Sequence, residues 1–255
     1  MIDIAKIAKV VDDAARNAKA IPQISAKHKI SVEQGYAIQS AAFSRRMARG
    51  ETQVGIKMGF TSRAKMLQMG IDDMIWGRLS DNMLIEDGDE INLSDYVHPR
   101  AEPEIAFLLG RTINHPCTAA EALAAVDAVA PAIEIIDSRY KNFKFSLADV
   151  VADNSSSSGF IVGSWALAET DLSNLGMILD FNGRPVQIGS SAAILGHPIR
   201  SLTAAARIAA AAGEPLQAGW IIMAGGATAA ESLKPGVTVR NSVQDLGFAG
   251  FKVSD

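Results

Sequence analysis

The chain has 255 residues, of which 48% are hydrophobic and 20% charged, a composition typical of a folded globular protein and unlike that of disordered chains. Its 24 basic and 28 acidic residues give a formal net charge of -4, so no general attraction to nucleic acid or to an anionic membrane is expected. A single cysteine, Cys117, excludes an intramolecular disulfide and CxxC motifs, and the cytoplasm is the expected compartment.

The first fifty residues are predicted to form helices. Ile4, Ile7 and Val11 fall on one helical face. Ser31 with Gln34 forms a capping-box pattern, which is typical of the start of a second helix. Charged residues interrupt the first stretch, so it lacks the apolar core of a signal peptide.

Gly50 is expected to end the second helix as its C′ residue, and the character of the sequence changes after it. No apolar run approaches the roughly 18 residues that span a bilayer, so membrane insertion is not predicted. We divide the chain into a helical region of residues 1–52 and a core of residues 53–255.

Short apolar segments bounded by turns predict strands in the core. They are QVGIKMG (53–59), PEIAFLLG (103–110), AIEIID (132–137), FIVG (160–163), WIIMAGG (220–226) and VTVRNSV (237–243). Asn182-Gly183 between two apolar runs predicts a β-hairpin with a type I′ turn.

Three helices are expected between these strands. Ser62 caps the segment before Gly70, Thr118 opens the alanine-rich segment 119–129, and the segment SLTAAARIAAAAGE (201–214) ends near Gly213. Together the elements predict a helical N-terminal region followed by a β-rich core with a few short helices.

Glu102 and Glu104 are candidate metal ligands. Strand alternation sends both side chains to one face of HPRAEPEIAF. Two buried carboxylates repel each other unless a proton or a cation neutralises them, which favours a hard metal ion. The alternative is a solvated strand face, where such pairs are common.

A third carboxylate strengthens the metal hypothesis. Glu134 lies between Ile133 and Ile135 in an apolar strand, where an uncompensated charge is unfavourable. Three carboxylates and no set of histidine ligands suit Mg²⁺ or Mn²⁺ better than Zn²⁺.

Lys57 lies in the apolar strand VGIKMGF. Its side chain either extends along the core to place its ammonium in water, or holds the ammonium in a site that binds an anionic group. The glycine-flanked turn into the Ser62-capped segment favours the second outcome. Other chemistries lack their motifs, because the sequence has no GxSxG elbow, no HExxH and no dinucleotide-binding glycine fingerprint.

Several long segments together resemble one family, the hydratase/decarboxylase branch of the fumarylacetoacetate hydrolase superfamily. They are KMGFTSRAKMLQMGI, HPRAEPEIAF, PAIEIIDSRYKNFKF, VVADNSSSSGFIVG, AAILGHP and MAGGATAA. The resemblance extends from about Val54 to Val239. It implies an α+β fold, with a mixed, curved β-sheet or roll as the core, helices packed outside it and a helical N-terminal region. Within the branch, the SRY-NFKF and GG-TAA segments are more similar to 4-oxalocrotonate decarboxylases than to 2-hydroxypentadienoate hydratases.

The resemblance also implies site residues. It places the metal ligands on Glu102, Glu104 and Glu134, and the active-site lysine on Lys57. The acid of the family's LTD motif falls on Asp81, and the serine of its ADNAS motif falls on Ser156. Asp81 and Ser156 are therefore expected to serve in proton transfer and positioning.

Three positions depart from the family pattern. Pro103 stands between two metal ligands, where it has no N–H to donate, so its strand is expected at a sheet edge or at a bulge. The ADNAS motif has Ser155 in place of alanine, and Lys141 reverses one charge in SRYKNFKF.

The implied activity is Mg²⁺-dependent decarboxylation of 4-oxalocrotonate (2-oxohex-3-enedioate) to 2-hydroxypenta-2,4-dienoate and CO₂ in the meta-cleavage degradation of aromatic compounds. The nearest alternative is a 2-hydroxypenta-2,4-dienoate hydratase with the same metal and lysine. An acylpyruvate-type hydrolase is more distant, and a metal-free binding protein would make the carboxylates incidental. The resemblance also implies a homo-oligomer and a complex with a hydratase that receives the product.

Overall fold

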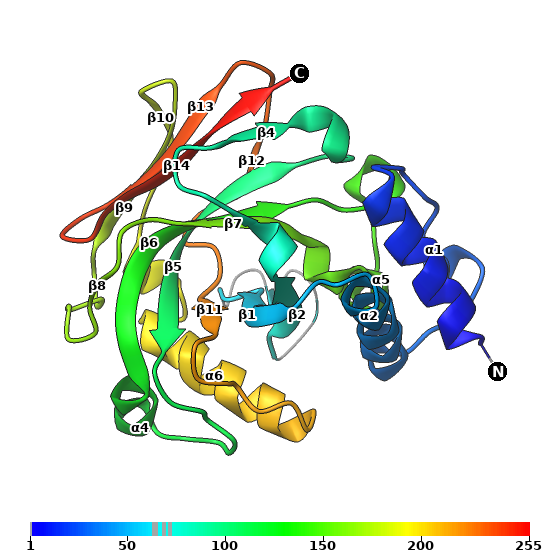
Figure 1. Cartoon of the computed structure of the whole chain (residues 1–255), viewed down its shortest axis with the longest axis horizontal. Helices are drawn as coiled ribbons and strands as arrows, with labels where there is room; N and C mark the ends of the chain where they lie inside the picture. The colour runs from blue at the N-terminus through cyan, green and yellow to red at the C-terminus, as the bar shows by residue number, and fades with distance from the viewer. Residues whose placement is uncertain (1, 63–65, 68–69, 71–72) are drawn as a thin grey trace.

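A long, curved sheet forms the centre of the protein, which the structure, a computed structural model, describes over residues 2–62, 66–67, 70 and 73–255 (Figure 1). Its strands, in sheet order, are β2 (Ile75–Ser80), β1 (Gln53–Gly59), β11 (Ile221–Met223), β5 (Arg100–Leu109), β6 (Val126–Ile136), β7 (Ser157–Val162) and β3 (Leu84–Ile85), with β12 (Glu231–Ser232) beside β5 and β8 (Ala166–Leu167) beside β6. The pairs β1–β11 and β3–β7 are parallel and the others antiparallel, which confirms the predicted mixed sheet.

A second sheet packs against the curved one. Its strands, in order, are β10 (Arg184–Ser190), β9 (Gly176–Phe181), β13 (Thr238–Val243), β14 (Gly247–Ser254) and β4 (Glu90–Asn92). Leu179, Val239 and Phe251 of this sheet share one buried cluster with Ile133 and Ile135 of β6. The outward face of β6 is thereby covered, and its other face is left for the site.

The helices lie around the two sheets, as Figure 1 shows. They are α1 (Ile4–Arg16), α2 (Val32–Met47), α4 (Ala119–Ala124), α5 (Leu147–Ala152) and α6 (Pro198–Ala211). Short 3₁₀ turns are η1 (Ile24–Ala26), η2 (Asp81–Met83), η3 (Leu93–Asp95), η4 (Lys141–Phe143), η5 (Asn154–Ser156) and η6 (Ser191–Ala193). None of the described helices is long and apolar enough to cross a bilayer. The helix expected after Ser62 falls mostly on residues outside those described.

Local signals for helices and turns are largely confirmed. Helix α1 buries Ile7 and Val11, and Ser31 forms the predicted capping box at the start of α2. Gly50 is not the C′ residue, because α2 ends at Met47 and its C-cap is the next residue. Gly50 instead turns the chain two residues beyond that cap, with a φ of 103°.

The predicted hairpin is also confirmed. Strands β9 and β10 pair in antiparallel fashion on either side of Asn182 and Gly183. These residues have φ values of 54° and 74°, and two positive φ angles are the signature of a type I′ turn.

The alanine-rich helix after Thr118 was predicted too long. The capping box with Glu121 is present, but α4 ends at Ala124 and Val126 already begins β6. The eleven-residue strand β6 pairs along the length of β5, with Val129 opposite Phe107. Tertiary strand pairing has overridden the helix propensity of the alanines.

The expectation that Pro103 lies at a sheet edge or at a bulge is wrong. Strand β5 is interior, and its register with β6 is regular around Pro103, which faces Ile133. The Pro103 carbonyl accepts the N–H of Ala227, 2.9 Å away, in the segment between β11 and β12. Because the nitrogen and carbonyl of one strand residue point to the same side, the missing N–H faces this loop rather than β6. Proline is therefore tolerated inside the sheet, because the β5–β6 ladder needs no N–H donor at position 103.

Candidate active site

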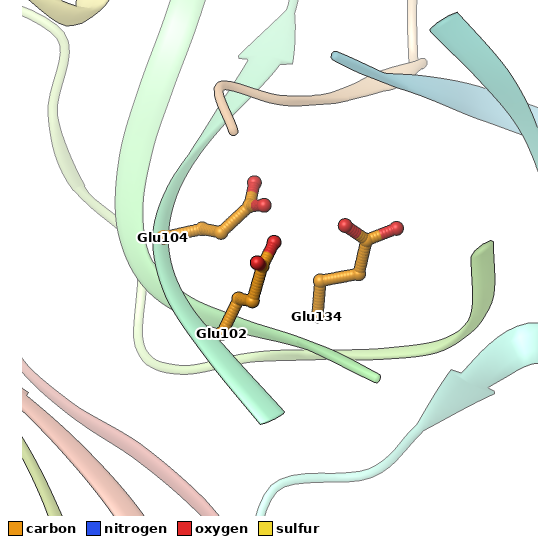
Figure 2. Close-up of side chains that lie close together, drawn as sticks. All are labelled: Glu102, Glu104 and Glu134. Carbon is orange, nitrogen blue, oxygen red and sulfur yellow. The ribbon is translucent and has the colours of Figure 1, made fainter. Parts of the chain in front are cut away.

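Three carboxylates converge from the neighbouring strands β5 and β6. Glu102 lies directly opposite Glu134 in the register, and Glu104 follows on the same face of β5. Figure 2 shows the three side chains pointing toward a common space. An oxygen atom from each lies within 4.8 Å of the others. Strand alternation and pairing therefore assemble the cluster that the sequence predicted.

The cluster is buried and incompletely hydrogen-bonded. Glu104 and Glu134 are 0% exposed, and Glu102 is 9% exposed. The N–H of Gly225 donates to Glu104 Oε2 at 2.7 Å. Among the described residues, Glu104 Oε1 and Glu134 Oε1 have no hydrogen-bond partner. Buried carboxylate oxygens are unfavourable without a partner, so this arrangement calls for a cation.

The electrostatics lead to the same conclusion. Burial raises the pKa of Glu104 well above its ordinary value, and the neighbouring charge of Glu134 raises it further. Burial also raises the pKa of Glu134, although Lys57 opposes the shift. Oxygen donors alone are the ligands that hard divalent cations prefer. The residues present therefore fit Mg²⁺ or Mn²⁺.

Lys57 extends from β1 into the same cluster. Its side chain is 4% exposed, and Nζ lies 2.9 Å from Glu134 Oε2. Nζ also donates a hydrogen bond of 3.2 Å to the carbonyl of Ser155. Burial alone would lower the pKa of Lys57, but the carboxylates, Glu134 first, outweigh it and raise the pKa. Lys57 is thus a buried cation in the site, not a side chain that reaches solvent.

Ser156 lies in η5, the turn that joins α5 to β7. It is 4% exposed, and its Oγ has no hydrogen-bond partner among the described residues. The adjacent residue, Ser155, contacts Lys57 through its carbonyl. Ser156 therefore offers an unused hydroxyl next to the contact of Lys57.

Asp81 is not brought into this cluster. It is exposed at the end of β2, where its carboxylate accepts the N–H groups of Thr52 and Asn82. Lys57 pairs with Gly77, so Asp81 lies four residues farther along the strand, on the order of 13 Å away. Within this chain the contacts of Asp81 are those of a turn, and its role in proton transfer stays a prediction.

A glycine pair completes the site, and sequence reasoning did not assign it a role there. Gly225 donates to Glu104 and has a φ of 97°. A Cβ on Gly225 would lie 2.3 Å from Thr61 Oγ1, and one on Gly226 would lie 3.0 Å from Glu102 Oε2. The signal was the GG dipeptide after a strand, which indicates close backbone approach.

The chain is similar to known proteins along most of its length. The fumarylacetoacetate (FAA) hydrolase C-terminal family model matches residues 54–254. A 4-oxalocrotonate decarboxylase from Pseudomonas sp is 57% identical over 98% of both chains. A 2-keto-4-pentenoate hydratase from Paraburkholderia xenovorans (strain LB400) is 38% identical over 86% of this chain and 82% of its own.

A solved structure extends the similarity to the fold. The 4-oxalocrotonate decarboxylase from Pseudomonas putida G7, complexed with magnesium and adipate, superposes with a TM-score of 0.95 at 38% identity. The match covers 98% of this chain and 97% of that one. It includes the curved sheet and the N-terminal helices, as the fold prediction required. The chain belongs to the fumarylacetoacetate hydrolase family.

Proposed function

We propose that the protein uses this site to decarboxylate 4-oxalocrotonate to 2-hydroxypenta-2,4-dienoate and CO₂ with Mg²⁺ as its cofactor. It is a carboxy-lyase of the meta-cleavage degradation of aromatic compounds. The observation that carries this function is 57% identity along 98% of the chain to a 4-oxalocrotonate decarboxylase, joined to a buried carboxylate cluster that fits the cation. The magnesium in the structure of a 38% identical decarboxylase supports the choice of metal.

The reaction needs a place for the electrons of the breaking bond. In 2-oxohex-3-enedioate the lost carboxylate lies one double bond beyond the β-keto position, so the electrons can reach the 2-oxo oxygen. Mg²⁺ at Glu102, Glu104 and Glu134 would supply Lewis acidity toward the substrate's 1-carboxylate and 2-oxo group. A preformed positive environment of this kind stabilises the transition state more than the ground state.

Lys57 is the second source of positive charge in our proposal. Its ammonium has three N–H donors, of which one binds the Ser155 carbonyl. The ion pair with Glu134 holds the ammonium beside the metal-binding carboxylates. From there it can donate to the oxygen that accumulates charge or orient a substrate carboxylate. The buried Ser156 hydroxyl, which has no hydrogen-bond partner among the described residues, is the positioning donor in this proposal.

The alternative is the hydration of 2-hydroxypenta-2,4-dienoate. The hydratase from Paraburkholderia xenovorans is 38% identical, which is well below the 57% identity to the decarboxylase from Pseudomonas sp. The SRY-NFKF segment also favours the decarboxylase. Each substrate offered separately to one Mg²⁺-loaded preparation separates the two functions.

The finer partners are part of the same proposal. Adipate in the related decarboxylase supports a small dicarboxylate as ligand. We further propose a homo-oligomer in the cytoplasm that associates with the hydratase consuming its product. Light scattering of the purified protein tests self-association, because a single species of 27.0 kDa would contradict it.

The direct test mixes the protein, Mg²⁺ and 2-oxohex-3-enedioate and measures CO₂ release. We expect stoichiometric CO₂ and the absorbance of the dienol product. A protein that folds and binds Mg²⁺ but releases no CO₂ while hydrating the dienol would overturn the assignment in favour of the hydratase.

A further inference from the structure

The turn η5 has an uncommon backbone. Asn154, Ser155 and Ser156 have φ values of 51°, 52° and 63°, so three consecutive non-glycine residues adopt the left-handed conformation. L-residues rarely adopt it, and usually singly. Such backbone strain persists only where the surroundings enforce it, and it gathers at functional sites.

The surroundings that enforce this turn are on the edge strand β2. The side-chain amide of Asn154 pairs with Arg78 in both directions, accepting its N–H at 2.8 Å and donating to its carbonyl at 2.9 Å. Ser155 Oγ donates to the carbonyl of Trp76 at 2.7 Å. The turn therefore takes the place of a neighbouring strand along the free edge of β2.

Gly77 permits this close approach. It lies between the two strand residues that bind the turn, and a Cβ there would be 2.4 Å from the carbonyl oxygen of Asn154. Gly77 is also the register partner of Lys57 on β1. The turn and Lys57 thus meet next to the one position of β2 that lacks a side chain.

At this position the turn contacts the ammonium of Lys57. Among the described residues, the ion pair with Glu134 and the hydrogen bond to the Ser155 carbonyl fix the direction of Nζ. The first contact belongs to the metal-binding cluster, and the second belongs to the turn. Displacement of the turn would leave the charge of Lys57 in place but change the direction of its N–H groups.

We propose that Asn154 is a positioning residue for the decarboxylation. Its amide anchors the left-handed turn to β2, the turn presents the Ser155 carbonyl to Lys57, and Lys57 is thereby aimed at the substrate. The inference rests on the proposed role of Lys57 and adds a residue that does not itself touch the substrate.

The test is a double-mutant cycle with Asn154→Gly and Lys57→Met. Glycine accepts the left-handed backbone without strain, so Asn154→Gly removes the anchor and leaves the fold intact. We expect kcat to fall about 10- to 100-fold, because small misplacements of a catalytic group have effects of this order. KM and the Mg²⁺ dissociation constant should stay within about threefold. In the Lys57→Met background, Asn154→Gly should cause no further loss.

A matched control is Asn182→Gly. Asn182 also has a left-handed backbone, with a φ of 54°, and its Oδ1 accepts the N–H of Thr238 at 2.8 Å in the β9–β10 hairpin. Asn182→Gly therefore makes the same chemical change as Asn154→Gly, at a position far from Lys57 along the chain. Its kcat should equal that of the parent.

Gly77→Ala is the second variant, because its Cβ would push the Asn154 carbonyl away. It should reproduce the loss of kcat with normal Mg²⁺ affinity. Three results would each overturn the inference. Asn154→Gly could keep kcat within threefold of the parent, its loss of kcat could add fully to that of Lys57→Met, or it could lose Mg²⁺ affinity in parallel with kcat. Adipate affinity of the four Mg²⁺-loaded proteins should likewise stay within about threefold. A parent protein that binds adipate but releases no CO₂ would mark failure of the proposed reaction, which is thereby distinguished from failure of the inference about Asn154.

Discussion

Two clusters of buried charge lie close together in the sequence but differ in how their polar atoms are satisfied. In the first, each guanidinium nitrogen of Arg139 has a partner, namely the Asp153 carboxylate, the Asp153 carbonyl or Ser158 Oγ. The second Asp153 oxygen accepts the backbone N–H of Arg139. In the cluster of Glu102, Glu104 and Glu134, two oxygens lack partners within the described chain.

The difference shows how to tell a structural ion pair from a ligand site. Burial raises the pKa of Asp153 to about 6, while Arg139 opposes the shift. Burial raises the pKa of Glu104 well above its ordinary value, and Lys57 is the cation that opposes this shift. A buried pair that satisfies itself holds the fold together. A buried cluster with unsatisfied oxygens is built for a partner from outside.

Metal removal should produce the largest effect. Without a cation the three carboxylates cannot act on the substrate, so EDTA should abolish CO₂ release and excess Mg²⁺ or Mn²⁺ should restore it. The stability of the Arg139–Asp153 pair should not depend on the metal. Full activity of metal-stripped protein would remove the distinction between the two clusters.

Arg139→Met should have the next largest effect, on stability. It leaves the Asp153 carboxylate buried without its partner, and breaking such a pair costs about 3–5 kcal/mol in unfolding free energy. Urea denaturation measures the change. The control is Arg207→Met, which breaks an ion pair with Asp73 at half-exposed side chains and should cost less than about 1 kcal/mol. Equal losses for the two variants would contradict a structural role for Arg139.

Lys57→Met should act on rate. If the ammonium contacts the oxygen on which charge accumulates, kcat should fall by about 10²–10³ while KM changes much less. The side chain keeps its approximate volume, so the fold should persist. Steady-state kinetics on a variant shown to bind Mg²⁺ provides the measurement, and turnover within a few-fold of the parent would leave Lys57 without a catalytic role.

The smallest effect concerns pH and the metal-free protein. The folded state holds protons on Glu104 more tightly than the unfolded chain does, so this stabilisation is complete below about pH 4.5 and is lost as pH rises through the raised pKa. The pKa of Asp153 is also raised, to about 6, so its contribution to stability is likewise lost as the pH rises from the ordinary pKa of an aspartate to about 6. Unfolding free energy in EDTA should therefore fall with rising pH, by about 1.4 kcal/mol for each unit of pKa shift.

Mg²⁺ should abolish the part of this pH dependence of the unfolding free energy that is due to Glu104. The part due to Asp153 should remain. Denaturation curves with EDTA and with Mg²⁺ across the same pH range separate the two. Identical slopes would contradict a metal at the carboxylates.

Local patterns in the sequence were enough for much of the fold and for the cluster. The capping box at Ser31, the turn at Asn182 and the alternation of Glu102 and Glu104 are each set by neighbours within a few residues. The start of β6 was missed because its pairing with β5, rather than alanine propensity, decides the structure of residues after Ala124.

Contacts between distant segments lay beyond such patterns. Ser155 accepts a hydrogen bond from Lys57 across 98 positions of the chain, and no spacing rule links the two. Ser155 also shows what one departure from the family motif does, since its hydroxyl binds Trp76. Lys141, another departure, is exposed in η4. Asp81 was assigned from a motif alone, and its contacts are those of a turn.

The central claim is that Glu102, Glu104 and Glu134 together hold the cation used in catalysis. Anomalous diffraction from crystals loaded with Mn²⁺ tests it most directly. We predict one peak per chain, about 2.0–2.2 Å from oxygens of Glu102, Glu104 and Glu134, in crystals that release CO₂ from the substrate. A peak bound elsewhere, with these carboxylates unliganded in active crystals, would contradict the account.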